Sequence, residues 1–556
     1  MEPMSTVAGS SANSQSSHSP RAFLIVTSII ALALSTLPYF IGYVGRRSGV
    51  YLWAGTSPSD YAVYLAWIRA AADGSLRDPH LFAGGHPGML INPIYWLMGL
   101  IVKQTGLSGA AVYHGARVIF GALLLYTLWR FVRLCTPDPL TRRLAFLFLC
   151  FSSGFGWCLG WLPLKYWSID LWQPEAFTFL SLYSYPHFCA ALALQVATIG
   201  LLLKTVTSGR YKYAVAAGVC ALTLAIVHTY DVITLVCIWL AYAAAPRSGT
   251  VDDSLMRKRA WLAGLIAGAL TAPGVAYIYF AMRTDRVFAQ RVSEPTMSSP
   301  LYTVLIGYGG VLLLAILGIR LANRPVNGLA GVGRVGHPET GVLLPIWAVV
   351  NVAVSYFPVL FQRKMLQGEH VALCVLAAVG AAHLLRRKLP SLDWTRLRAA
   401  ELLLAAFLSI GNVLYLYHDT RDILSGVEQR RYRSTLSTGE VDALAWVRAH
   451  TNQNAVIQPV PWRDPATGKD VDDTLALFAP GITGRAVYAG HWAETPDFNN
   501  RVDDVFKMAY AADGATAAKK SGIAYLVFSQ PSGPNPAVGR LRLVYSNSGA
   551  SVYAIE

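Results

Sequence analysis

The chain has 556 residues, of which 54% are hydrophobic and only 14% are charged, and its formal net charge is +15. An ordinary soluble domain carries about 25% charged residues, so this chain cannot cover a soluble surface of its size. The composition argues against a water-soluble enzyme, a disordered protein and a coiled coil, and it places most of the chain in lipid.

The positive charge is confined to one part of the chain. From Asp419 to the C-terminus there are 14 Lys+Arg and 15 Asp+Glu, and subtraction from the totals of 46 and 31 leaves 32 and 16 before that point. Because the excess lies in the apolar part, it does not indicate a nucleic-acid partner. We expect a disordered, Ser-rich cytoplasmic tail (1–20), a transmembrane domain (21–418) and a nearly neutral domain (419–556).

The apolar part contains about eleven segments with the composition of transmembrane helices. They are 22–44, 110–129, 144–163, 188–203, 213–227, 232–245, 261–282, 301–319, 342–358, 371–385 and 399–417. The fifth and sixth are short and are separated by His228-Thr-Tyr-Asp231, which predicts two short helices that meet near one membrane face.

The basic residues predict the orientation. With the N-terminus in the cytoplasm, the inner loops carry about three times as many Lys and Arg as the outer loops, as the positive-inside rule requires. An odd number of helices then places the C-terminal domain outside the cytoplasm, in the periplasm, at the cell surface or in an organelle lumen. Among the possible membranes we expect the inner membrane of a bacterium. Two outer segments, 45–109 and 165–187, are longer than a connection requires, and such loops are usually functional.

The C-terminal region combines helical and β-rich segments. Helical patterns cover 440–450 and 499–510, and β-rich runs cover 455–460, 523–529, 542–545 and 551–555. The expected fold is therefore a polytopic α-helical membrane protein with a C-terminal extracytoplasmic α/β domain. All seven cysteines lie in or beside apolar segments, so neither a disulfide framework nor a cysteine metal site is expected.

Asp60 is the first candidate for chemistry. It follows the first apolar segment and precedes Tyr61 and Tyr64. A carboxylate held between a membrane and an aromatic-rich helix can act as a general base. The alternative is a helix N-cap shared with Ser57 or Ser59, and the sequence favours neither role.

Arg363 and Lys364 form a second candidate site between the ninth and tenth segments, followed by His370. Arg can bind a lipid phosphate through its planar fork and Lys as a point charge, whereas the alternative is snorkelling at a helix end. We favour phosphate binding because the outer loops are otherwise poor in cations. Arg117, with His114, either lines the same cavity or forms a packed, internally bonded pair.

Aromatic and acidic residues gather in the second long loop and beyond it. Glu175 and His187 are interleaved with Trp and Tyr, a mixture that suits a sugar but also an aromatic belt at the interface, which for the Trp and Tyr residues alone is favoured. His228, Tyr230 and Asp231 lie where two short helices meet. Asp231 is either a second acid in the cavity or a helix cap, and we favour the cavity.

The C-terminal domain contributes one dense stretch, 484–496, which places His491 and Glu494 on a loop after a β-like run. Their spacing is not that of metal ligands, and the alternative is a turn that docks the domain onto the membrane part. The sequence has no GxGxxG opening a βαβ unit, no GxxxxGK[ST], no GxSxG and no HExxH. Nucleotide chemistry and metalloprotease chemistry therefore have no support.

The arrangement resembles the GT-C superfamily of integral-membrane glycosyltransferases, in its many helices, its long first outer loop with an acidic residue, and its outer C-terminal domain. The residues that carry the resemblance are Ser59-Asp60-Tyr61 with Tyr64, Tyr185-Pro-His187, Gln362-Arg363-Lys364 with Gly368 and His370, and Gly484-Arg-Ala-Val-Tyr488 with His491-Trp492 and Glu494-Thr. The WWDYG-type motif of oligosaccharyltransferases is missing, and the first loop has one well-placed Asp instead of an acidic pair.

The resemblance implies transfer of a sugar from a polyprenyl-phosphate or diphosphate carrier to a glycan, glycolipid or protein acceptor on the outer face, with inversion at the anomeric carbon. It implies that Asp60 deprotonates the acceptor and that Arg363 and Lys364 hold the leaving phosphate. The other candidate substrate ligands are His370, Tyr64, Arg117, Glu175, His187, His228, Tyr230, Asp231, His491 and Glu494. Membrane lipid is a partner, nucleic acid is not, no metal ligand is assigned, and a divalent cation stays open as a cofactor.

Two other function classes fit the same composition. One is a transporter or flippase of a lipid-linked or anionic solute, and the other is a noncatalytic envelope-assembly protein. A transporter needs charges at both membrane faces, whereas the unusual polar residues here gather on the predicted outer side. This asymmetry favours the enzyme.

Overall fold

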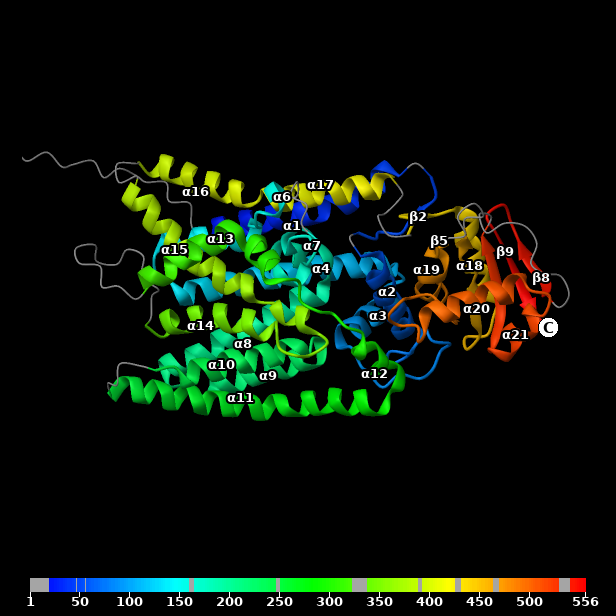
Figure 1. The fold of residues 1–556 in the computed structure, drawn as a ribbon, viewed down its shortest axis with the longest axis horizontal. Helices are drawn as coiled ribbons and strands as arrows, with labels where there is room; N and C mark the ends of the chain where they lie inside the picture. Colours follow the sequence, from blue (N-terminus) through cyan, green and yellow to red (C-terminus); the bar gives the residue numbers. More distant parts are fainter. Residues whose placement is uncertain are drawn as a thin grey trace, which may run out of the picture.

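The computed structural model describes residues 20–46, 48–55, 57–159, 165–246, 251–322, 338–388, 393–425, 432–463, 470–529 and 541–556. These residues form a helical bundle and a smaller C-terminal domain that follow one another along the longest axis of the molecule (Figure 1). The helices α2 (Pro58–Ala72), α3 (Pro93–Thr105) and α12 (Arg286–Ser293) lie between the two parts. We call this side of the bundle the domain end. The predicted tail falls outside the described residues except for its last residue, where α1 begins.

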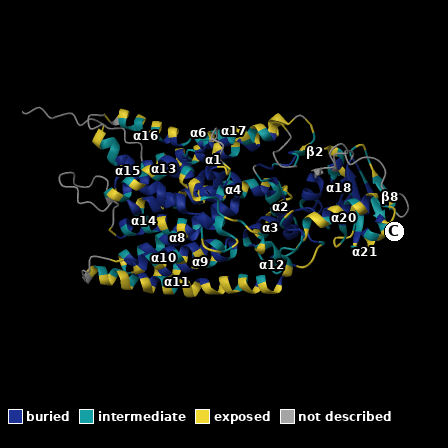
Figure 2. Ribbon diagram, viewed as in Figure 1, coloured by how far each residue is buried: buried dark blue, intermediate teal, exposed yellow. Residues whose placement is uncertain are grey.

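The bundle consists of apolar helices of different lengths. They are α1 (Pro20–Gly45), α4 (Gly109–Cys135), α5 (Pro139–Phe151), α8 (Pro186–Ser208), α9 (Lys212–Val227), α10 (Tyr230–Ala244), α11 (Val251–Thr284), α13 (Leu301–Ala322), α14 (Pro338–Val354), α15 (Glu369–Lys388), α16 (Trp394–Leu408) and α17 (Ile410–Ser425). Figure 2 shows exposed residues along α11 and α16, while the interior is buried. The exposed side chains include large apolar ones such as Ile29 and Leu265, a surface that suits lipid.

The number of membrane spans is settled only in part. Among the described residues, six helices are long and apolar enough to cross a membrane, namely α1, α4, α8, α11, α13 and α15, and the bent pair α16 and α17 makes a seventh if it is one span. Helices α9, α10 and α14 are apolar but shorter. The structure therefore supports a polytopic helical protein, and the predicted number of about eleven spans stays a prediction.

Two predicted spans are not continuous helices. The predicted helix at 144–163 ends as α5 at Phe151, and only the short α6 (Gly156–Leu159) follows. The reason is a buried carboxylate, since Asp170 accepts hydrogen bonds from the backbone N–H groups of Gly154 and Gly156 at 3.1 and 3.2 Å and so fixes a non-helical turn. The predicted helix at 399–417 is bent by 48° between α16 and α17. There Asn412 donates to the carbonyl of Phe151 at 2.8 Å and ties the bend to the first break.

The first long loop is mostly ordered secondary structure. Helix α3 confirms the short helix predicted at 92–104, and it begins where the Asn92 side chain accepts from the N–H of Ile94 and ends at Gly106 in the left-handed conformation. Helix α2 packs against α3 and against α19 (Thr474–Thr483) of the C-terminal domain. The loop thus forms the layer on which the C-terminal domain rests.

The second long loop is folded into the bundle. It contains η1 (Ile169–Leu171), η2 (Pro174–Ala176) and α7 (Thr178–Ser184), and every residue of α7 is buried. Segment 165–187 therefore places Glu175 and the Tyr185-Pro-His187 run inside the domain end instead of above it.

The C-terminal domain has a mixed five-stranded sheet in the order β6-β3-β7-β9-β8. Strands β3 (Val456–Pro459), β6 (Ala486–Val487) and β7 (Ile523–Ser529) are parallel, whereas β8 (Leu541–Ser546) and β9 (Ala550–Ile555) are antiparallel. Alternate residues of β7 enter two cores, with Val527 facing α18 (Thr438–His450) and α19, and Leu526 facing α20 (Phe498–Tyr510) and α21 (Gly514–Lys520). A separate pair is formed by β4 (Trp462–Arg463) and β5 (Asp470–Asp472). The helices and strands predicted for this region are confirmed.

The C-terminal domain is fastened to the first loop. Strand β1 (Val50–Tyr51) pairs with β2 (Thr435–Leu436), and the N–H of Val487 donates to the carbonyl of Leu81 at 2.7 Å. Arg448 on α18 forms an ion pair of 2.7 Å with Asp73, the C-cap residue of α2. Backbone pairing and an ion pair together fix the domain on the α2 and α3 layer.

Glycines allow two helices of the bundle to pack closely. On α13 and α15, a Cβ added at Gly318 would collide with the carbonyl oxygen of Leu376, and one added at Gly380 would collide with that of Leu314. Since the obstacles are backbone atoms, neither contact can be relieved by a side-chain rotation. The two helices depend on glycine here.

We expect Gly380→Ala to destabilise the protein by about 1–3 kcal/mol, because an extra methyl group in a packed interface is overpacking. The measurement is thermal unfolding in detergent micelles, followed by tryptophan fluorescence. The matched control is Gly268→Ala on α11, where a Cβ meets nothing within 4 Å and alanine favours the helix by about 1 kcal/mol. Equal melting temperatures for the two variants would contradict the packing argument.

Candidate active site

Asp60 lies in the first turn of α2, at the domain end. The helix starts with Ser57 as N-cap and Pro58 as the first helical residue, and the Ser57 side chain makes no cap hydrogen bond. Asp60 is therefore not the N-cap, and its Oδ2 accepts a hydrogen bond of 3.0 Å from the hydroxyl of Tyr185 instead. Asp60 is half-buried, so a substrate can reach it.

An aromatic wall stands next to Asp60 and consists of Tyr64, Tyr95, Tyr185 and His187. Tyr64 stacks on Tyr95 with ring centroids 4.8 Å apart, and meets Tyr185 and His187 edge-on at 5.6 and 5.0 Å. Tyr95 Oη and His187 Nδ1 are 2.7 Å apart. Burial raises the pKa of Tyr64 well above its ordinary value, and the charge of Asp60 adds to this shift. Tyr64 thus stays neutral, and its ring contacts the other three members of the wall.

Arg363 and Lys364 lie on η3 (Gln362–Leu366), which contacts η2 of the buried second loop. The Arg363 guanidinium covers the ring of Trp172 at 5.1 Å, and its Nε is 3.6 Å from Oε1 of Glu175. Lys364 Nζ lies 4.6 Å from the centroid of the Tyr230 ring. Among the ion pairs of the described residues, none involves Lys364, so its charge is the more available of the two.

His228 and Asp231 occupy the junction of α9 and α10. Their Nδ1 and Oδ1 atoms are 3.1 Å apart, and Asp231 is fully buried. The N-cap of α10 is Thr229, so Asp231 is in the first turn and is not the cap. The His228 ring is 6.2 Å from that of His187, which joins this pair to the aromatic wall.

The C-terminal domain reaches the site through His491 and Glu494. Glu494 Oε1 forms an ion pair of 2.9 Å with Arg291 Nε, and the Arg291 guanidinium covers the Trp67 ring at 4.9 Å. His491 Nδ1 accepts two backbone N–H groups at 3.1 Å each. Burial lowers the pKa of His491, while the charges of Glu494 and Asp60 oppose that shift. The 484–496 loop therefore lies near Asp60.

The structure brings eleven of the thirteen predicted site residues to the domain end. They are Asp60, Tyr64, Glu175, His187, His228, Tyr230, Asp231, Arg363, Lys364, His491 and Glu494. The other two are held by protein groups. His370 is buried between Ser152, Cys374 and Thr178, at 3.0 to 3.3 Å.

Arg117 is buried, and it donates four of its five N–H groups to other protein atoms. It donates to the carbonyl oxygens of Ser35 and Leu182 at 3.1 and 2.7 Å, to Thr36 Oγ1 at 3.0 Å, and through Nε to His114 Nδ1 at 3.4 Å. The packed, internally bonded pair of Arg117 and His114 is thus the alternative that the structure shows. Arg117 fixes α1, α4 and α7 to one another.

The sequence did not single out Tyr95, Tyr185, Arg291 or Asp78 as site residues. Tyr185 belongs to the Tyr185-Pro-His187 run of the sequence resemblance, and Arg291 is one of the few cations in the predicted outer loops. The sequence therefore offered a reason to consider both as site residues. Tyr95 reaches the site because of the fold of the first loop. Among the described residues, no three His, Cys, Asp or Glu side chains are arranged to hold a metal ion, so we assign no metal ligand.

Comparison with known proteins identifies the architecture. No protein-family model and no curated protein matches the sequence, but solved structures match almost all of the chain. The archaeal oligosaccharyltransferase AglB from Archaeoglobus fulgidus, in complex with an inhibitory peptide and a dolichol-phosphate, has 13% identity and a TM-score of 0.51, over 92% of this chain and 69% of its own.

Two further structures have the same architecture. ArnT from Cupriavidus metallidurans, bound to undecaprenyl phosphate, has 12% identity and a TM-score of 0.50, over 97% of this chain and 99% of its own. The arabinofuranosyltransferase AftD from Mycobacteria has 15% identity and a TM-score of 0.50, over 97% of this chain and 40% of its own. The chain therefore has the fold of the GT-C membrane glycosyltransferases, as the sequence resemblance predicted. Identities this low establish the fold alone.

Asp78, in the first loop, should make the stability depend on pH. Burial raises the pKa of Asp78 from 3.8 to about 8, with Arg291 opposing and Glu494 adding to the shift. Because the folded state binds the proton more tightly, the stability from this group is complete below about pH 4 and is lost as the pH rises through 8.

We expect Asp78→Asn, which cannot ionise, to melt a few degrees above the wild type at pH 8.5, and the gap to shrink steadily toward pH 5. The measurement is the melting temperature in detergent micelles as a function of pH. Asp504→Asn, at a half-exposed position on α20 where the carboxylate pairs with Lys507, is the control and should show no such trend. A gap that does not change with pH would contradict the raised pKa.

Proposed function

We propose that the protein is a membrane glycosyltransferase that moves a sugar from a polyprenyl-phosphate carrier to an acceptor at the domain end, with Asp60 as the general base. The observation that carries the proposal is the arrangement of an accessible carboxylate, an aromatic wall and a pair of cations at one end of a GT-C fold. Two structures with this fold contain dolichol-phosphate or undecaprenyl phosphate, which supports the same class of carrier here.

The chemistry requires two different groups on two sides of the sugar. The acceptor hydroxyl gives its proton to Asp60 as its oxygen forms a bond to the anomeric carbon, and the bond from that carbon to the phosphate oxygen breaks. Because the acceptor attacks from the side opposite the phosphate, the anomeric configuration inverts. The electron pair stays on the phosphate, whose charge Lys364 and Arg363 neutralise.

The other residues of the domain end position these groups. Tyr185 orients the Asp60 carboxylate through its hydrogen bond, and Glu175 and Trp172 hold the Arg363 guanidinium. His228, Tyr230 and Asp231 form the surface between the cations and His187 of the aromatic wall, and a sugar would lie there. His491 and Glu494 close the site from the C-terminal domain.

The orientation of the molecule follows from the basic residues. We propose that the domain end faces away from the cytoplasm, in the inner membrane of a bacterium, because the opposite ends of the helices carry most of the Lys and Arg. A carrier lipid then enters from the side, between helices, and its phosphate stops at the level of η3.

We expect Asp60→Asn to lower sugar transfer by at least about 10²-fold, the usual scale for loss of a general base. The amide oxygen still accepts from Tyr185, so the fold and the protein level should not change. The measurement is transfer from a panel of radiolabelled undecaprenyl-phosphate hexoses and pentoses in membranes, with Asp504→Asn as the control. Wild-type turnover in Asp60→Asn would reject the base, and carrier translocation without product would favour a transporter.

We expect Lys364→Met to raise the apparent KM for the donor about tenfold or more, since a charge-assisted contact to the phosphate is lost. The measurement is the initial rate as a function of donor concentration in the same membranes. The control is Lys165→Met, an exposed lysine with its Nζ 5.4 Å from the Tyr166 ring. An unchanged donor KM in Lys364→Met would move the phosphate site elsewhere.

A further inference from the structure

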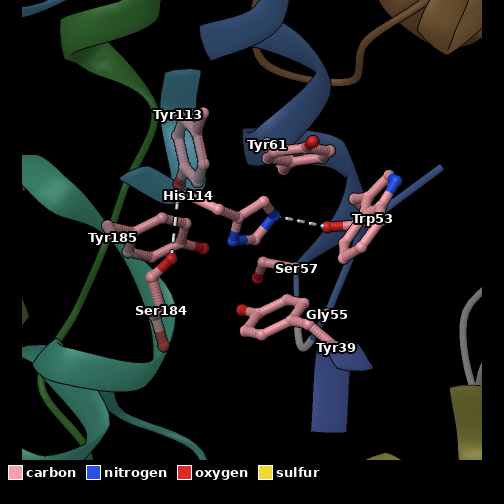
Figure 3. A pocket seen from close by; sticks show the side chains of 9 residues that line it. All are labelled: Tyr39, Trp53, Gly55, Ser57, Tyr61, Tyr113, His114, Ser184 and Tyr185. Carbon is pink, nitrogen blue, oxygen red and sulfur yellow. Dashed lines mark hydrogen bonds between the residues drawn. The ribbon is translucent and has the colours of Figure 1, made fainter. Parts of the chain in front are cut away.

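The cavity beside Asp60 is too small for a sugar. Figure 3 shows the side chains around it, among them Tyr39, Tyr61 and His114, and the space that they leave holds about one water molecule. The His114 ring stands among these side chains and donates through Nε2 to the carbonyl of Trp53 at 3.0 Å. A sugar at the domain end must therefore be held by side chains outside this cavity.

Arg291 is an accessible cation at the domain end. Its side chain is 31% exposed, its Nε lies 2.9 Å from Glu494 Oε1, and its guanidinium carbon lies 4.9 Å from the centroid of the Trp67 ring. The other two nitrogens, Nη1 and Nη2, carry four N–H groups, and no described residue accepts a hydrogen bond from them. Arg291 therefore has a free planar edge with two adjacent donor nitrogens.

The position of Arg291 is fixed by the helix that carries it. Helix α12 has Asp285 as its N-cap, whose carboxylate accepts from the N–H of Phe288 at 3.0 Å and from that of Met89, in the first loop, also at 3.0 Å. The same carboxylate lies 2.8 Å from Nε2 of His80, a second residue of the first loop. Because the first loop holds the start of α12, Arg291 further along this short helix has a defined place, as a binding group requires.

On the side of the base, Arg291 and Asp60 have common neighbours. The charges of both residues act on Tyr64 and on His491. The Tyr64 ring also meets the Trp67 ring, which Arg291 covers, with centroids 5.6 Å apart. Arg291 is therefore close to the carboxylate that takes the proton in the proposed reaction.

On the side of the phosphate, Arg291 and Lys364 have common neighbours. The charges of both cations act on His187. The charge of Arg291 also acts on Tyr230, whose ring centroid lies 4.6 Å from Lys364 Nζ. A sugar transferred from a phosphate at Lys364 to an acceptor at Asp60 therefore lies within reach of Arg291.

The charges around Arg291 favour an uncharged ligand. Those that act most strongly on Tyr64 belong to Asp60, Arg291, Glu494 and Glu175, which are three carboxylates and one guanidinium. An anion beside Tyr64 would be repelled by the carboxylates and attracted only by Arg291, whose charge Glu494 already offsets. Sugar hydroxyls carry no charge, and they accept hydrogen bonds from a guanidinium.

We propose that Arg291 determines the sugar specificity of the site, and that its Nη1 and Nη2 donate hydrogen bonds to two adjacent hydroxyl oxygens of the transferred sugar. The donors of a guanidinium stand at a fixed spacing in one plane, so they distinguish a pair of neighbouring hydroxyls from a single one. Glu494, from the C-terminal domain, orients the guanidinium through the ion pair. This assignment rests on the proposed function, and it narrows the substrate to an uncharged sugar with two adjacent hydroxyls.

The test uses donors that lack one hydroxyl. In membranes, the undecaprenyl-phosphate sugar that the wild type transfers is compared with its monodeoxy analogues and with undecaprenyl-phosphate glucuronate. We expect kcat/KM to fall about tenfold or more for the deoxy donors at two adjacent positions and for the glucuronate. Arg291→Lys keeps the charge and the pairing with Glu494 but loses the fork. It should lower kcat/KM for the parent donor about tenfold or more, and for those two deoxy donors less than about threefold.

The control is Arg286→Lys, at an exposed position in the first turn of the same helix, which should behave as the wild type does. Undecaprenyl phosphate, which carries no sugar, should inhibit Arg291→Lys and the wild type equally, and the two proteins should melt at the same temperature in detergent micelles. Weaker inhibition of Arg291→Lys would make Arg291 a phosphate ligand, and equal losses with all donors would make its role structural. Either result would overturn the inference.

Transfer and sugar binding are tested separately. If Asp60→Asn retains transfer while the deoxy donors show the expected losses, the base is wrong and the role of Arg291 stands. If the wild type transfers no donor, saturation-transfer NMR on the whole protein in nanodiscs decides, with the methyl glycosides of glucose, mannose, galactose and arabinose. We expect at least one of them to bind, and to bind about fivefold more weakly to Arg291→Lys. Binding of none to the wild type, or equal binding to Arg291→Lys, would overturn the inference.

Discussion

The hydrogen bond from the Tyr185 hydroxyl to Asp60 is the contact on which the domain end depends. It joins the α7 to α8 junction, inside the bundle, to the first turn of α2, outside it. Tyr185 also belongs to the aromatic wall, where its ring meets that of Tyr64 edge-on. One side chain therefore fixes both the carboxylate and the aromatic rings beside it.

Burial explains why the charges of the domain end occur as pairs. A charge removed from water is costly unless a partner lies near it, and Arg363 and Arg291 each have a carboxylate within 3.6 Å, namely Glu175 and Glu494. Lys364 differs, since its ammonium group lies against the face of the Tyr230 ring. An aromatic face stabilises a cation without neutralising it, so Lys364 keeps a charge that an arriving phosphate can use.

Sequence patterns predicted most of the fold because hydrophobic length and alternation are local properties. They predicted α3 and the elements of the C-terminal domain, whereas they missed the breaks after Phe151 and at Ser409, which depend on Asp170 and Asn412 from distant segments. The same limit applies to the candidate site: unusual residues can be found from the sequence, but their tertiary contacts cannot. Asp60 and Lys364 were found as unusual residues at predicted outer positions, but His370 and Arg117 look equally unusual in sequence and only their tertiary partners distinguish them.

The C-terminal domain has a defined role in this arrangement. Its loop 484–496 holds Arg291 through Glu494, and Arg291 lies near Tyr64 and His187. The domain is fastened to the first loop by backbone pairing, and it contacts α2 through α19 and through the ion pair of Arg448 with Asp73. It therefore cannot move without disturbing the helix that carries Asp60. The α/β domain thus completes the active site that we propose, since it supplies the counter-ion for a cation that the bundle alone would leave unpaired.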